Sequence, residues 1–376
     1  MTRILVAGDY HYEKFCGGEN HIDKSVVYEF SQANVSIVNM ESPIVHNSDN
    51  VKIKKTGPNL KSELFALELL GKLGVSVVSL ANNHIMDYSE SSLLYTMSSL
   101  SNRGIRYVGA GKNACEASEP LIIRDNEITI GIINACESEW SIATETNSGA
   151  NPLDVVDICR MIKSLKEQVD FVIVIIHGGH ELYKYPSPRM VKLYRFFVDH
   201  GANAIIGHHT HCIGGYEIYE GSPIVYSLGN FLFLKENASE SWNTGLLCAL
   251  DFHKNMPVSM KLTPVKHMLP KKRLHVCESR ERATIMNEVD EISNTISSHD
   301  KLLEEWNRFI ESQTKRLRIL SPLQGVKNSI LRGGLFRLGL DRFVKNDYNL
   351  RTILNHVRCE AHKDVVIDLI TREISK

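Results

Sequence analysis

Residues 207–211 read Gly-His-His-Thr-His and directly follow the apolar residues 204–206. Imidazole fills a core poorly because its two ring nitrogens need partners, but two imidazoles spaced i, i+2 at a strand end can be directed at one point. His209 and His211 have this spacing. The pattern indicates a metal site at the end of a buried strand.

Polar residues follow other apolar runs of the chain in the same way. Asp9 and His11 come after residues 3–8, Glu41 after 35–40, Asn83 after 75–80, and His177 lies within 171–179. Carboxylate, imidazole and amide oxygen together suit Mn, Fe or Zn better than calcium. With His209 and His211 these seven ligands are too many for one tetrahedral ion, but they suit two ions that share a bridging carboxylate. The set predicts two divalent transition-metal ions that ionise a bridging water and hydrolyse a phosphoester.

Each candidate ligand also has a structural interpretation. Asp9 is a residue type common in turns, and His177 is compatible with a buried histidine bonded to backbone. The histidines of 208–211 could form a satisfied cluster in a loop, although neighbouring imidazoles repel one another when protonated. Asn39 and Asn82 are more typical of turns or caps, and we leave them out of the metal set. The metal hypothesis is favoured because all three ligand types fall at the same predicted sheet edge.

The elements that must position these residues are predicted by the apolar runs. The runs are continuous rather than alternating, which is typical of strands buried on both faces. Strands are predicted at 3–8, 35–40, 75–80, 128–135, 171–179, 203–209 and 222–233, and helical stretches at 61–73, 89–103, 154–168 and 188–200. This order predicts an α/β fold with buried sheets, in which ligands bind at the carboxyl ends of strands.

The sequence changes character near residue 270. From 281 to 318 apolar residues recur mostly three or four apart, which predicts one amphipathic helix, or two with a break near 297–300. A further helical stretch is predicted at 323–376, split near Gly333-Gly334. We therefore predict a working domain at 1–265 and a C-terminal helical extension at 270–376, joined by the basic residues 271–273.

Composition disfavours several classes of protein. The chain has 376 residues, of which 43% are hydrophobic and 23% charged, enough for a sizeable core. A formal net charge of -1 gives no general attraction for polyanions, so no nucleic acid is expected as a partner. Eight cysteines without a C-x-x-C pair predict reduced thiols. The N-terminal apolar run is too short for a signal peptide and no run is long enough to cross a membrane, so we expect a cytoplasmic protein.

Six segments of the chain resemble one known family in their order and spacing. They read GDYHYE, NMESPI, SLANNHIMDYSESSL, IHGGHELY, IIGHHTHCIGGYE and YSLGNFLF. Over residues 1–250 the chain resembles the CapA family of capsule and poly-γ-glutamate biosynthesis proteins, within the calcineurin-like metallophosphoesterase superfamily. The resemblance implies a four-layer α-β-β-α sandwich of two mixed sheets, with a dinuclear metal centre at the strand ends.

The resemblance also implies a role for each ligand. Carried over by position, it assigns one metal to Asp9, His11 and His211, the other to Asn83, His177 and His209, and the bridge to Glu41. The superfamily usually bridges with aspartate, whereas Asn-Met-Glu at 39–41 is typical of CapA-like proteins, and the longer side chain could widen the metal spacing. Many CapA-like proteins lack a histidine two residues after the first aspartate, so His11 brings this chain closer to active phosphoesterases.

Two further residues resemble a catalytic pair. His84 is similar to the superfamily histidine that protonates the leaving group or holds the transition-state oxygen. Asp87 would orient its imidazole and raise its pKa. Alternatively, residues 82–84 cap a helix that begins near Asp87 or Ser89, and His84 is structural.

Lys55, His180 and Asn230 are the predicted substrate-binding residues. The lysines of residues 51–59 could meet an anionic substrate, although a charge run is more often a solvated surface. His180 could instead simply end its strand. Asn230 recurs near the site in the CapA-like family but could equally be a turn residue.

Residues 315–345 contain eight basic residues interleaved with Leu, Ile and Phe. Such a segment could make peripheral contact with an anionic membrane. Packing on the catalytic domain is favoured, because glycines and Pro322 interrupt a single long helix.

Two functional hypotheses remain. The leading one is a metal-dependent hydrolase of phosphoesters, linked to capsule or poly-γ-glutamate biosynthesis, that acts by metal-bound hydroxide on an anionic small molecule or polymer. The alternative is a non-hydrolytic assembly factor that binds an anionic polymer in the same pocket. A nuclease would share the dimetal chemistry, but the overall charge gives it no support.

Overall fold

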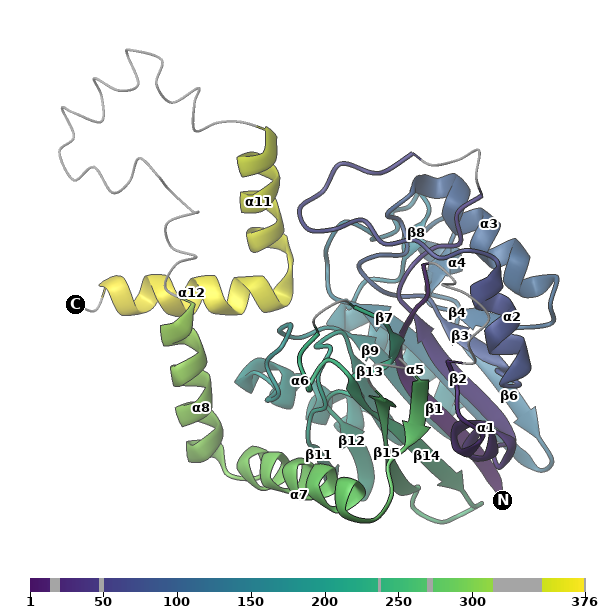
Figure 1. Ribbon diagram of the computed structural model, residues 1–376. Coiled ribbons are helices and arrows are strands. Elements are labelled where there is room, and N and C mark those ends of the chain that lie inside the picture. The colour runs from purple at the N-terminus through teal and green to yellow at the C-terminus, as the bar shows by residue number, and fades with distance from the viewer. Residues whose placement is uncertain (14–20, 47–50, 236–237, 269–272, 314–346, 375–376) are drawn as a thin grey trace, which may run out of the picture.

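The computed structural model describes residues 1–13, 21–46, 51–235, 238–268, 273–313 and 347–374. Two mixed sheets lie face to face (Figure 1). The first runs in the order β16 (Arg273–Val276), β15 (Ser259–Met268), β14 (Thr244–Phe252), β1 (Thr2–His11), β2 (Val35–Met40), β3 (Val77–Ser79) and β4 (Arg106–Val108), with β13 (Asn230–Phe233) also paired to β1. The second runs in the order β11 (Tyr216–Tyr219), β12 (Ser222–Val225), β10 (Ala204–His208), β9 (Phe171–His177), β7 (Ile128–Cys136) and β6 (Leu121–Asp125). A small separate pair joins β5 (Ala110–Gly111) to β8 (Gly149–Ala150).

Alternate side chains of the strands bury against different layers. On β1, Ile4 and Val6 point into the core between the sheets, where they join Ile173 of β9. Leu5 points the other way, into a core that includes Phe30. This outer core is made with α1 (Lys24–Ser31), α2 (Phe65–Lys72) and α3 (Ser89–Ser101). Because both faces of the strands are covered, their sequences are continuous apolar runs.

The second sheet is covered on its outer face by α5 (Val155–Lys166) and α6 (Pro188–Asp199). The side chain of Asp154 caps α5 by accepting from the backbone of Val156, and Ser187 caps α6 in front of Pro188. A short helix, α4 (Ala114–Ala117), precedes β6. The predicted four-layer α-β-β-α sandwich of two mixed sheets is confirmed.

The predicted single strand at 222–233 is wrong. The chain forms β12 in the second sheet and then crosses to form β13 in the first. The crossing needs glycine at two places: Gly229 has φ +65°, and a Cβ on Gly8 would lie 2.0 Å from the Gly229 carbonyl oxygen. The sequence does not show the break, because the residues between the two strands are buried as well.

The predicted C-terminal helical part is confirmed, in its two-helix form over the first segment. The 281–318 pattern corresponds to α7 (Ser279–Ile296) and α8 (His299–Ser312). They are followed by α11 (Asp347–Arg358) and α12 (Glu360–Ile374), which lie beside the loops at one end of the sheets (Figure 1). Val289 of α7 lies in the core between the sheets, whereas Trp306 of α8 packs with Val365 of α12.

Some sequence predictions concern residues that the structure does not describe. The basic segment 315–345, the split near Gly333-Gly334 and residues 271–272 lie outside the described residues. β16, at 273–276, continues the first sheet beyond the predicted end of the working domain at 265, and the division into two domains stays a prediction.

Two further expectations concern the described residues alone. None of their helices is long and apolar enough to cross a membrane. Their cysteines are free, and the reduced state of the thiols stays a prediction.

The core between the sheets gives a test of stability. Replacing the fully buried Ile173 with alanine leaves a cavity that neighbouring strands cannot fill, so Ile173→Ala should lower the free energy of unfolding by about 2–5 kcal/mol. Ile367→Ala, at a position of α12 that is 54% exposed, should change it by less than about 0.5 kcal/mol. Urea denaturation followed by circular dichroism measures both, and equal effects would contradict the described core.

Candidate functional site

Parallel strands of both sheets end at the same edge of the sandwich. In the first sheet β1 lies between β2 and β13, so Asp9 is in register with both Asn39 and Asn230. In the second sheet β9 and β10 are parallel, and His177 is in register with His208. The two sheets therefore direct polar residues towards each other at this edge, as is usual for α/β proteins.

Two groups of possible metal ligands lie at this edge and share Glu41. One group is Glu41, His177 and His209, and the other is Asp9, Glu41 and His211, with ligand atoms within 4.8 Å of one another in each. Glu41 Oε1 is 3.5 Å from His177 Nε2 and also 3.5 Å from His211 Nε2. Glu41 thus occupies the shared position that the resemblance assigns to the bridging carboxylate.

Asn83 lies beside the first group. Its Oδ1 is 3.0 Å from His177 Nε2, and its Nδ2 donates to Glu139 Oε1 at 3.3 Å. Because the amide nitrogen donates to Glu139, the amide oxygen faces the imidazole of His177, whose Nε2 is also 3.1 Å from His209 Nδ1. Ligands bound to one ion at about 2.1 Å lie at spacings of this order.

The structure places His11 in neither group. Its Nδ1 is 3.1 Å from Ser42 Oγ, and its ring packs on Phe233 with centroids 4.6 Å apart. Burial lowers the pKa of His11 to about 3, and His84 and His211 add to the shift while Asp87 opposes it. His11 is therefore a neutral, buried imidazole close to the two groups, and its role as a ligand stays a prediction.

The electrostatics of the site fit a cation. Asp9 and Glu41 are fully buried, and neither carboxylate oxygen of Glu41 has a hydrogen-bond partner among the described residues. Burial raises the pKa of Glu41, and the Asp9 carboxylate raises it further. A buried carboxylate without partners costs several kcal/mol, and a divalent ion removes that cost. The donors present fit Mn, Fe or Zn.

The backbone around the histidines is held in an unusual conformation. His209 has φ +92° and His211 φ +54°, in the left-handed region that residues with a Cβ seldom adopt. Such conformations cost about 1–3 kcal/mol each and concentrate at functional sites. Asp9 helps to hold this turn, since its Oδ2 accepts from the backbone N–H of His209 at 3.1 Å.

A second layer of side chains orients the candidate ligands. Asn39 Nδ2 donates to Asp9 Oδ1 at 2.7 Å, which agrees with leaving Asn39 out of the metal set. Asn230 Oδ1 accepts from His211 Nδ1 at 2.9 Å, so His211 Nε2 is the nitrogen that faces Glu41. His208 is a further residue of the site: its Nδ1 is 3.3 Å from Asp9 Oδ1, and the signal for it in the sequence was its place in the Gly-His-His-Thr-His motif.

His84 and Asp87 form a buried pair beside the metal candidates. His84 Nδ1 is 2.6 Å from Asp87 Oδ2, and Lys55 Nζ is 2.5 Å from Asp87 Oδ1 and 3.0 Å from His84 Nδ1. Burial lowers the pKa of His84 and Lys55 lowers it further, whereas Asp87 opposes this shift. The helix-cap alternative for residues 82–84 is wrong, because α3 begins at Ser89 with no side-chain cap.

The predicted substrate-binding residues lie in different surroundings. Lys55 lines a cleft, but its side chain is only 2% exposed and paired with Asp87, so it is no solvated surface lysine. Asn230 is fully buried against His211 and Trp242. His180 does not line the cleft: its Nε2 donates to the Ala361 carbonyl of α12, and its ring packs in an aromatic cluster. Their role in substrate binding stays a prediction.

The cleft beside His84 has a volume of about 250 Å³. One wall comes from the loop 55–58, with Asn83, His84, Glu139 and Glu181, and the opposite wall from Thr352, Asn355 and His356 of α11 and His362 of α12. Glu139, Glu181 and the second wall were not among the residues predicted from sequence.

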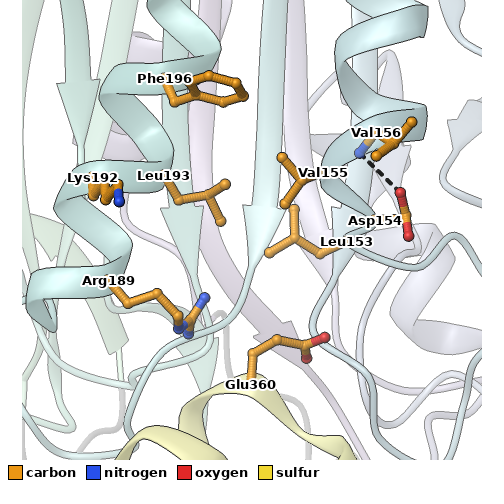
Figure 2. A pocket seen from close by; sticks show the side chains of 9 residues that line it. All are labelled: Leu153, Asp154, Val155, Val156, Arg189, Lys192, Leu193, Phe196 and Glu360. Carbon is orange, nitrogen blue, oxygen red and sulfur yellow. Dashed lines mark hydrogen bonds between the residues drawn. The ribbon is translucent and has the colours of Figure 1, made fainter.

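A larger cavity, of about 530 Å³, lies between α5 and α6 (Figure 2). Leu153, Val155, Leu193 and Phe196 give it an apolar lining, and Glu360 of α12 lies at one end. It contains none of the candidate metal ligands, so size alone does not locate the chemistry of this molecule.

Comparisons with known proteins identify relatives of this chain. A family profile described as "Bacterial capsule synthesis protein PGA_cap" matches residues 4–235. The PGA biosynthesis protein CapA of Bacillus subtilis is 30% identical over 233 residues, or 60% of this chain and 60% of that protein. The capsule biosynthesis protein CapA of Bacillus anthracis is 28% identical over 202 residues, or 52% of this chain and 49% of that protein. A probable polyglutamine synthesis accessory protein of Mycobacterium tuberculosis is 25% identical over 303 residues, or 74% of this chain and 78% of that protein.

Solved structures align less closely. A phosphatase from Mycoplasma pneumoniae aligns with a TM-score of 0.45 and 16% identity, over 72% of this chain and 95% of that chain. The calcineurin-like phosphoesterase YfkN from Bacillus subtilis aligns with a TM-score of 0.42 and 15% identity, over 83% and 98%. Alignments at this level do not bear on activity.

The matches to the two Bacillus proteins span three fifths or less of their length, so activities of those whole proteins are not transferred here. The profile match, however, covers more than half of the 376 residues and includes every candidate metal ligand. The chain therefore belongs to the bacterial capsule synthesis protein PGA_cap family, as its resemblance to CapA proteins implied.

Proposed function

We propose that this chain is a hydrolase that uses two divalent transition-metal ions to cleave an anionic phosphoester during synthesis of a capsule or glutamate polymer. The metal part rests on Glu41, a fully buried carboxylate that belongs to both groups of candidate ligands and has no hydrogen-bond partner among the described residues. The polymer part is supported by the relatives, which are named for capsule, PGA or polyglutamine synthesis.

Different side chains would contribute to different steps of such a reaction. Two bound ions would supply the positive charge that makes water nucleophilic and neutralises the phosphate. Asp9 and Glu41 provide the anionic ligands, and burial lowers the pKa of His177 and His211, so these imidazoles stay neutral and able to bind cations.

His84 is placed to handle the proton of the leaving group. Asp87 accepts from its Nδ1 and fixes the ring, so Nε2 is the nitrogen that can donate when the imidazole is doubly protonated. Lys55 neutralises the second oxygen of Asp87. His84 lines the cleft, where a leaving group would lie.

Metal content tests the proposed centre. We expect two ions of Mn, Fe or Zn per chain by elemental analysis, and loss of both in Glu41→Gln, which keeps the size of the side chain but removes the charge that both groups share. The exposed His299→Ala is the matched control and should keep both ions. Saturating metal at 100 times the dissociation constant should stabilise the wild type by about 2.7 kcal/mol for each bound ion and leave Glu41→Gln unchanged. Equal metal content in the two variants would contradict a shared carboxylate.

Turnover tests the role of His84. His84→Asn should lower kcat for an aryl phosphate by about 10²–10⁴-fold while metal content is retained, because a proton donor is lost and the proposed ligands remain. The exposed His200→Ala should turn over as the wild type does. Two bound ions without hydrolysis of mono-, di- or pyrophosphate esters would reject the hydrolase and favour the non-hydrolytic, polymer-binding alternative.

A further inference from the structure

α12 is fixed to loops that carry residues of the candidate site. Glu360 accepts from the backbone of Ser138 at 2.7 Å, the Ala361 carbonyl from His180 at 2.8 Å, and Asp364 from Arg189 at 2.7 Å. Arg189 also pairs with the buried Glu137, which in turn accepts from the backbone of Gly179 at 3.1 Å. These loops follow β7 and β9, whose carboxyl ends lie at the site. The helix is therefore part of the site's framework.

Among the described residues, the carboxylate of Glu139 links α11 to the proposed metal ligand Asn83. Glu139 accepts from Asn83 at 3.3 Å through Oε1 and from Asn355 of α11 at 3.2 Å through Oε2. Asn355 Nδ2 is 3.2 Å from His362 Nδ1, and the rings of His362 and His356 stack with centroids 5.3 Å apart. These contacts fix the position of the wall made by α11 and α12 relative to Asn83.

The position of the cleft shows which part of a substrate it would hold. His84 and Asn83 lie in its lining, so the cleft opens directly beside the proposed metal centre. A phosphoryl group at the metals and a proton donor at His84 would place the leaving group inside it. Its volume of about 250 Å³ is below the range of about 300–1,000 Å³ for drug-sized ligands, so it suits one small unit.

The residues that line the cleft suit one of three kinds of leaving group better than the other two. A second phosphate or carboxylate would meet the carboxylates of Glu139 and Glu181, while the ammonium of Lys55 is already paired with Asp87. A hydrocarbon offers no hydrogen bond to the carboxylates, amides and imidazoles that line the cleft, so removing water from these groups would be costly. A hydroxyl-rich unit can donate to the carboxylates and accept from amide and imidazole N–H groups, as each hydroxyl both donates and accepts.

We infer that α11 and α12 form a leaving-group subsite that selects phosphoesters of a small polyhydroxylated alcohol, a sugar or polyol, with His356 and His362 as specificity-determining residues. This inference rests on the proposed phosphoester hydrolysis and names the substrate class of the same site.

Binding and turnover test the subsite separately. In calorimetry on the full chain loaded with Mn²⁺, a non-hydrolysable sugar phosphonate should bind at least about tenfold more tightly than butylphosphonate, the gain of one or two well-placed hydrogen bonds. In His356→Ala and His362→Ala the ratio of the two affinities should fall towards one. Leu354→Ala, at a position of α11 that is 50% exposed, is the matched control and should keep the ratio.

In a second experiment, kcat/KM for a sugar phosphate is divided by kcat/KM for butyl phosphate in the same variants. Thr352→Val, which keeps the shape of the side chain and removes its hydroxyl, is a second variant should a histidine variant fail to fold, and it should lower the ratio too. Selective phosphonate binding without turnover would reject the hydrolase and keep the subsite. Wild-type ratios near one, tighter binding of a bisphosphonate than of the sugar phosphonate, or ratios unchanged in the folded variants would overturn the subsite.

Discussion

The organisation of this protein depends on burying two carboxylates at the junction of two sheets. Asp9 lies near the end of β1, Glu41 directly follows the adjacent parallel strand β2, and both are fully removed from solvent. Imidazoles of β9, of β10 and of the turn after β10 lie beside them: His177, His208 and His211 counter the effect of burial on Asp9 and hold its pKa below the ordinary value. For Glu41, burial and the Asp9 carboxylate outweigh the opposing effect of Lys55, and its pKa is raised. This imbalance is what a cation between the sheets would correct.

The rest of the site supports that arrangement. The left-handed turn at His209 and His211 brings two imidazoles to the same edge, and close backbone approach makes glycine necessary just before it, since a Cβ on Gly207 would lie 2.1 Å from the Tyr226 carbonyl oxygen. Asn39, Asn230 and Glu139 each fix the orientation of one candidate ligand through a hydrogen bond. A centre of this kind needs the second layer as much as the ligands, because ring and amide orientations decide which atom faces the ion.

Much of the sandwich and the placement of the ligands were predictable from sequence. Strands buried on both faces are continuous apolar runs, and polar residues just after such runs stand out, which is why Asp9, Glu41 and His177 were found. The strand β14 carries an equally apolar run and could have been predicted, whereas β15 contains Pro264, which argues against a strand in the middle of a sheet. The buried position of Lys55 was not predictable, since a charge run is typical of a solvated surface and only the contact with Asp87 draws this lysine inwards.

The second wall of the cleft was beyond sequence analysis for a similar reason. An amphipathic pattern shows that a helix buries one face, but the surface it packs on is decided by contacts such as those of His180 with Ala361 and Arg189 with Asp364, which join residues far apart in the chain.

Anomalous diffraction from crystals grown with Mn²⁺ or Zn²⁺ tests the proposed metal centre most directly. We predict two peaks, one on each side of the Glu41 carboxylate, within coordination distance of His177 and His211 respectively. A single peak away from Glu41, or no peak at this edge of the sheets in metal-saturated crystals, would contradict it.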